Sequence, residues 1–79
     1  MIDISEITEL LIESGYHPYS DFESINKLYI KDGIEVWGIK NEQVFRDIIK
    51  ILKEAFPQWL NIDTIISGKD GRFSVIISQ

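Results

Sequence analysis

The segment from Asn41 to Pro57 constrains the fold most, because its apolar residues recur with the period of an α-helix. Asn41 is a favourable N-cap residue, and Pro57 cannot continue a helix. The apolar positions that follow this period are Val44, Phe45, Ile48, Ile49, Leu52, Ala55 and Phe56. A helix with one apolar side buries that side against another layer, so the sequence predicts a packed domain.

A second helix is predicted near the start of the chain. Asp3 is its N-cap, and Glu6 stands three residues later, in the capping-box position. Gly15 is expected to end the helix. The apolar residues of one broad side are Ile4, Ile7, Leu10, Leu11 and Ile12.

A β-hairpin is predicted between the two helices. Residues 26–31 and 34–40 read as strands, and Asp32-Gly33 between them favours a type I′ turn. This turn would pair Leu28 with Trp37. The face expected in the core then carries Leu28, Ile30, Trp37 and Ile39, and the reverse face carries Lys27, Tyr29, Lys31, Ile34 and Val36.

A second hairpin is predicted after the second helix. Its strands are residues 62–67 and 72–78, and its turn is residues 68–71. The expected fold class is α+β: a single compact domain over residues 1–79, built as a two-layer sandwich in the order α-β-β-α-β-β. Two helices would cover one face of a four-stranded, mainly antiparallel sheet. The last strand lacks Lys, Pro or a bulge after Arg72, so we expect it either inside the sheet or paired with another chain.

Negative charge is concentrated at the start of the chain. The first 25 residues hold six carboxylates and neither Lys nor Arg, whereas the other 54 residues sum to +1, giving the net charge of −5. Glu6, Glu9 and Glu13 fall within about 60° of one another around the first helix, opposite its apolar side. We refer to these three residues as the acidic stripe. A surface of one sign is either offset by basic residues of the same chain or used on a partner.

The connection after the first helix is rich in aromatic residues. Tyr16, Tyr19 and Phe22 lie there, and Trp59 lies in a later connection. Exposed aromatic side chains are common anchors of protein interfaces. We therefore predict a non-enzymatic protein-interaction module whose partner carries a basic surface. The predicted partner-binding residues are Glu6, Glu9, Glu13, Tyr16, Tyr19, Asp21 and Phe22.

Two other functions stay open. An acidic surface can imitate the phosphates of a nucleic acid, so the chain could be a phage or mobile-element inhibitor of a nucleic-acid-handling enzyme. Alternatively, Lys27, Tyr29 and Lys31 could bind RNA or DNA through a sheet face, since cations and aromatic rings together form stacking platforms. The negative net charge disfavours nucleic acid as a partner.

Several kinds of chemistry find no support in the sequence. The chain has no cysteine and one histidine, His17, which lies in the aromatic loop. No catalytic residue, cofactor site or metal site is predicted, because a hydrolytic triad or a metal centre needs further groups at suitable spacing. The apolar runs are short, so neither a signal peptide nor a membrane span is expected. A cytoplasmic protein is predicted, either monomeric or dimeric through an edge strand.

The order of helix, Gly15-Tyr16, β-hairpin and second helix over residues 4–56 resembles the small mRNA-interferase toxins with a double-stranded-RNA-binding-like fold. In that family a histidine on a strand acts on RNA. Here His17 lies in a loop, and the last two predicted strands have no counterpart. We therefore transfer no function from this resemblance.

Overall fold

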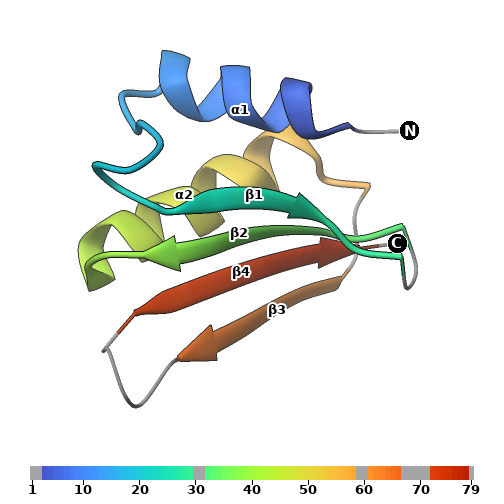
Figure 1. Ribbon diagram of the computed structural model, residues 1–79. Coiled ribbons are helices and arrows are strands. Elements are labelled where there is room, and N and C mark those ends of the chain that lie inside the picture. Colours follow the sequence, from blue (N-terminus) through green and yellow to red (C-terminus); the bar gives the residue numbers. More distant parts are fainter. Residues whose placement is uncertain (1–2, 30–31, 59–60, 67–71, 79) are drawn as a thin grey trace.

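The computed structural model describes residues 3–29, 32–58 and 72–78, together with the backbone of residues 61–66. The elements are α1 (Ile4–Glu13), β1 (Ser24–Lys27), β2 (Ile34–Ile39), α2 (Glu42–Ala55), β3 (Asn61–Ile66) and β4 (Phe73–Ser78). The strands lie in the order β1-β2-β4-β3, and all neighbours are antiparallel (Figure 1). The prediction of an α+β fold is confirmed.

Local signals at both ends of α1 explain where it begins and stops. The Asp3 carboxylate accepts a hydrogen bond from the backbone N–H of Glu6 at 3.0 Å. At the other end, Gly15 takes a φ of +96°, which glycine adopts at little cost. The N–H of Tyr16 then reaches back to the carbonyl of Leu11 at 2.8 Å. This 6→1 bond is that of a Schellman cap, and it turns the chain sharply toward the sheet.

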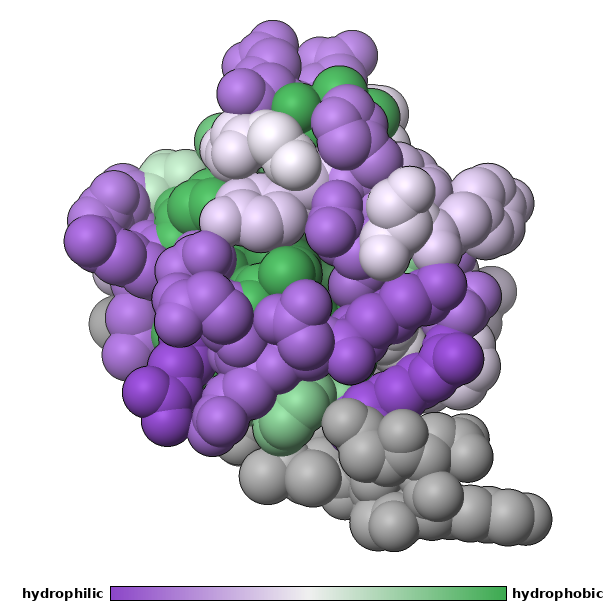
Figure 2. All heavy atoms as spheres, turned by 90° about the vertical axis from the view of Figure 1, so that its left-hand side faces the viewer, coloured by the Kyte–Doolittle hydropathy of each residue, from purple (hydrophilic) through white to green (hydrophobic). Residues whose placement is uncertain are grey.

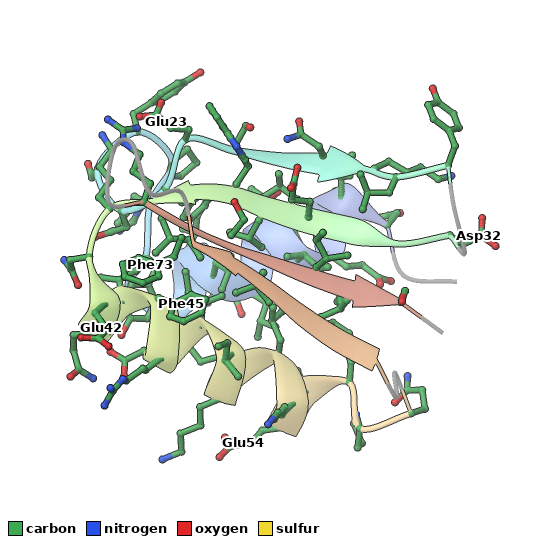
Figure 3. All side chains as sticks on the ribbon, turned by 90° about the horizontal axis from the view of Figure 1, so that it is seen from below. Glu23, Asp32, Glu42, Phe45, Glu54 and Phe73 are labelled. Atoms are coloured by element: carbon green, nitrogen blue, oxygen red, sulfur yellow. The ribbon has the colours of Figure 1, made fainter. Side chains whose placement is uncertain are left out.

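The α2 helix holds the core together from one side of the sheet. The Asn41 side chain caps its first turn by accepting from the N–H of Val44 at 2.9 Å. Phe45 of α2 stacks on Phe73 of β4, with ring centroids 4.6 Å apart (Figure 3). The buried residues of α2 follow the predicted helical period and are Val44, Ile48 and Leu52.

One core joins both helices to the sheet. Its buried residues are Ile7, Leu11, Phe22, Ile34, Val36, Ile39, Val44, Ile48, Leu52, Val75 and Ile77. Burying an aliphatic or aromatic side chain of this size contributes about 1.5–3 kcal/mol, so these contacts dominate the folding energy. The helices therefore lie on the side of the sheet where β2 and β4 present their buried residues.

A β-bulge in β2 decides which of its residues face the core. The register between β2 and β4 shifts between Val36 and Ile39, where Gly38 takes a φ of +72°. The extra residue lets Val36 and Ile39 both be buried although they are three positions apart. Trp37 is directed to the opposite face and is 47% exposed.

The predicted register of the first hairpin is wrong. Strand β1 ends at Lys27, which pairs with Ile34, so the strands are joined by residues 28–33 and not by a two-residue turn. Ile34 and Val36 are buried although the prediction placed them on the reverse face, and Trp37 is exposed. The prediction assigned residues alternately to the two faces of the strand, counting back from Ile39. It did not include the bulge, so it inverted the two faces of β2. Ile30 and Lys31 lie outside the described residues.

Strand β4 lies inside the sheet. It pairs with β2 on one side and with β3 on the other, from Asn61 opposite Ser78 to Ile66 opposite Phe73. We expected this strand either inside the sheet or paired with another chain. The strand order places it inside the sheet. The turn predicted at residues 68–71 lies outside the described residues.

Candidate interaction surface

The acidic stripe lies on the outside of α1. Glu6, Glu9 and Glu13 are all exposed, and the buried residues of the helix, Ile7 and Leu11, lie on its other side. Within the described part of the chain, none of these three carboxylates forms an ion pair. The last turn of α1 also carries no basic residue, so its negative dipole end adds to the field.

Tyr16 is half-buried and is tied to α2. Its hydroxyl donates to Asp47 Oδ2 at 2.6 Å, and Gln43 Nε2 donates to Asp47 Oδ1 at 2.9 Å. These bonds stabilise the charged carboxylate and lower the pKa of Asp47, with the Tyr16 hydroxyl as the main cause. The same carboxylate raises the pKa of Tyr16. Tyr16 thus joins the end of α1 to the middle of α2.

Asp21 holds the aromatic loop in a compact turn. Its carboxylate accepts from the N–H of His17 at 2.8 Å, and its own N–H donates to the carbonyl of His17 at 3.0 Å. Inside this turn, Tyr19 takes a φ of +70° and is 77% exposed. Tyr19 is therefore presented to solvent by a turn that Asp21 closes.

Phe22 must be removed from the predicted partner surface. Its side chain is 1% exposed and belongs to the core. The loop places it inward while Tyr19 points outward, because the chain returns to the sheet at Glu23. Trp59, the other aromatic residue of the predicted connections, lies outside the described residues.

An ionic cluster that the sequence did not indicate links three strands at one end of the sheet. Glu23 Oε1 accepts from the Arg72 guanidinium and lies 3.5 Å from Lys40 Nζ. The hydrogen bond from Arg72 is the main reason why the pKa of Glu23 is lowered. Lys40 also donates to the carbonyl of Tyr19. Figure 2 views this end of the molecule, where hydrophilic residues predominate.

A hollow of about 420 Å³ lies between the end of α1 and the outer side of α2. It is lined by Ser14, Tyr16, Asp47, Lys50, Ile51 and Glu54. Two carboxylates and one ammonium group surround a single apolar side chain there. This lining suits a polar contact better than an apolar ligand.

The residues of the predicted nucleic-acid face are not arranged along one strand. Lys27 is the last residue of β1, and Tyr29, which is 97% exposed, lies beyond it. Lys31 lies outside the described residues. The exposed aromatic residue on the uncovered sheet face is instead Trp37, which faces Ser24 across the β1–β2 pair.

The described ranges contain no group of three His, Asp or Glu side chains that could hold a metal ion. None of the helices in these ranges has the length and apolar character needed to cross a membrane. His17 is exposed, and its backbone N–H, not its ring, takes part in the turn with Asp21.

The comparison with known proteins gives no match: no protein family, no curated protein and no solved structure is significantly similar to this chain.

Proposed function

We propose that this protein is a small non-enzymatic interaction module that binds a partner with a basic surface. The observation that carries the proposal is the clustering of exposed carboxylates on α1. Glu23 and Glu42 are paired with cations of the chain itself, whereas Glu6, Glu9 and Glu13 are exposed together without a cation among the described residues. Three adjacent like charges repel one another on a helix, by roughly 0.2–0.5 kcal/mol per neighbouring pair. A basic partner would relieve this repulsion.

Tyr19 is the aromatic residue best placed to accompany the acidic stripe. It is held out by the Asp21 turn, close in sequence to the end of α1, and most of its surface is exposed. An exposed tyrosine offers a large contact area and loses little conformational entropy when it is fixed. Tyr16 and Asp21 support this surface by shaping the loop.

The proposal is tested with three immobilised baits: the native protein, the stripe variant E6Q/E9Q/E13Q, and the control variant D32N/E42Q/E54Q. Both variants change the net charge from −5 to −2, because each removes three carboxylates. Bound proteins from the source cells are identified and quantified by mass spectrometry. We expect a basic protein that the native and control baits retain and the stripe variant loses. If both variants lose the partner to the same extent, only the overall charge matters.

The stripe variant should also melt at the same temperature as the native protein or higher, because removing the three negative charges removes repulsion within α1. A large drop in melting temperature would instead identify the stripe as a structural ion-pair partner.

A narrower form of the proposal is an inhibitor that imitates nucleic acid. It is favoured by the arrangement of the stripe as a row of negative charges, spaced by about 4.5 and 6 Å along the helix axis at 1.5 Å per residue. Double-stranded DNA added to the captured complex should then release the partner. A partner that stays bound at saturating DNA would leave only the broader form of the proposal.

A further inference from the structure

The α1 helix carries apolar side chains that the core does not use. Five of its ten residues are Ile or Leu, and only Ile7 and Leu11 are buried. Ile4 is 36% exposed and Ile12 is 41% exposed. In α2, by contrast, every Ile, Leu, Val and Phe is buried or half-buried. Among the described residues, the exposed large aliphatic side chains are therefore Ile4 and Ile12, both on α1.

The two exposed isoleucines belong to one row on the surface of α1. Ile4, Thr8 and Ile12 follow one another at intervals of four residues, and residues with this spacing are neighbours along a helix. The Thr8 hydroxyl donates to the carbonyl of Ile4 at 2.8 Å, so its polar atom already has a partner within the helix. The methyl group of Thr8 is left to continue the row. We refer to these three residues as the apolar row.

The apolar row runs beside the acidic stripe. Glu9 stands three residues before Ile12, and residues three apart are neighbours on a helix surface. On its other side the row borders the buried Leu11, which stands three residues after Thr8. In Figure 1, α1 lies at the upper border of the molecule, with the sheet and α2 below it. The outer surface of α1 therefore combines an apolar row with an acidic edge.

The acidic stripe decides what can cover the apolar row. A second copy of this chain bound through the same face, a nucleic acid or an anionic lipid surface would bring further negative charge beside Glu9 and Glu13, which is unfavourable. A protein segment with Lys or Arg would bring the opposite charge. In the part of the chain that the structure describes, the ion pairs do not involve the stripe, so its carboxylates are available to such a segment.

The spacing of the apolar row favours a helix as the occupant. Residues four apart form a ridge, and such a ridge packs into the groove between the ridges of a second helix. The side chains of a strand repeat every two residues and do not match this spacing.

We propose that the apolar row binds an amphipathic helix of the partner. The apolar side of that helix packs on Ile4, Thr8 and Ile12, and its Lys or Arg residues lie against the acidic stripe. This inference rests on the proposed function and adds the kind of segment that the partner contributes.

Two synthetic peptides with the same length and the same content of Leu and Lys serve as probes. In one peptide leucine recurs every three or four residues, which gives an amphipathic helix, and in the other Leu and Lys alternate, which favours a strand. Fluorescence anisotropy measures their binding to the native protein. We expect the helical peptide to bind at least about tenfold more tightly than the alternating one.

Protein variants then locate the contact. I4Q/I12Q removes the apolar row but keeps every charge, and it should weaken binding of the helical peptide at least about tenfold, because two apolar contacts are lost. Y29Q is the control, since it removes an exposed aromatic side chain outside α1, and it should bind like the native protein. E6Q/E9Q/E13Q should also bind more weakly than the native protein, and added salt should reduce this difference.

Circular dichroism establishes that each variant is folded. If I4Q/I12Q is unfolded, T8K replaces it, because a cation in the middle of the apolar row should weaken binding as well. Equal binding of the two peptides would overturn the inference, and so would equal binding of the helical peptide to the native protein and to the folded row variant. These outcomes leave the proposed function intact if the pull-down still yields a basic partner that depends on the acidic stripe. A pull-down without such a partner contradicts the proposed function whatever the peptides do.

Discussion

Gly38 is the residue on which the geometry of β2 most depends. Its φ of +72° is rarely adopted by residues with a side chain. A Cβ atom at this position would lie 2.5 Å from Glu23 Cγ and 2.8 Å from Glu23 Cβ. Glu23 cannot easily move away, because Arg72 and Lys40 hold its carboxylate. Backbone conformation and close packing therefore both require glycine here.

We predict that Gly38→Ala lowers the free energy of unfolding by about 2–4 kcal/mol, as the sum of left-handed strain and overpacking. Gly15→Ala is the matched control. Gly15 also has a positive φ, but no atom lies within 4 Å of the added Cβ, so only the strain of about 1–2 kcal/mol is expected. Urea denaturation measures both. If the two substitutions lower the free energy of unfolding equally, the Glu23 side chain moves away at no cost. A smaller loss of stability for Gly38→Ala in an E23A background would confirm the clash.

The hydrogen bond from Tyr16 to Asp47 predicts a dependence of stability on pH. Because folding lowers the pKa of Asp47, the stabilisation is complete above the ordinary aspartate pKa and is lost as pH falls through the folded-state value. Because folding raises the pKa of Tyr16, the stabilisation is also lost at high pH, as pH rises through the folded-state value.

Tyr16→Phe should therefore lower the melting temperature by a few degrees at pH 7, with a smaller difference at either extreme of pH. Melting curves between pH 2 and pH 12 measure this. Tyr19→Phe, at the exposed tyrosine of the same loop, is the control and should match the native protein throughout. A Tyr16→Phe difference that grows in acid would contradict the assignment.

Single residues also show why the candidate surface was only partly predictable. The exposure of Glu6, Glu9 and Glu13 follows from the helical period, which is a local property of the sequence. Tyr19 and Phe22 are neighbours of similar character, yet one is exposed and the other buried. What separates them is the path of the loop, which the Schellman turn, the Asp21 turn and the Lys40 contacts set together. The two turns are local, but the Lys40 contacts join distant parts of the chain and leave no pattern in the local sequence.

Among the elements, β2 and β4 have hydrogen-bonded neighbours on both sides, whereas β1 and β3 are each paired on one side within the described residues. Successive amides of an interior antiparallel strand bond alternately to the two neighbours. In an edge strand only alternate amides are bonded. This contrast between β4 and β3 can be observed directly.

We predict slow hydrogen exchange at both Val75 and Ile76 of β4 in a dilute sample, and slow exchange at only alternate residues of β3. Amide exchange followed by NMR resolves the individual residues. Fast exchange at alternate residues of β4 would show that one of its two pairings is absent.

The helices were predictable to within a residue or two, and the first hairpin was not. Asp3, Gly15, Asn41 and Pro57 act within one turn of the helix ends that they define, so the sequence around them suffices. Which residues of β2 face the core depends instead on the bulge at Gly38, where the pairing of β2 with β4 shifts. Glycine in a strand can mark a bulge. Combined with Val36 and Ile39 three residues apart, Gly38 was the signal that could have corrected the face assignment.

At the scale of the whole molecule, charge and the apolar core are separated. The core lies between the helices and one sheet face, the acidic stripe lies along α1, and β3 forms the far border of the sheet (Figure 1).

The position of β4 also has a consequence for the order in which the chain can fold during synthesis. β3 leaves the ribosome before β4, yet its bonds in the sheet are all to β4. Ile34 of β2 can pair with Ile77 only after a further 43 residues have been translated. Residues 4–58 therefore emerge with one edge of β2 still unpaired and with the side of α2 that packs against β4, including Phe45, still uncovered. The nascent chain exposes this apolar surface until translation has passed residue 78, and a chaperone that shields hydrophobic segments would act in that interval.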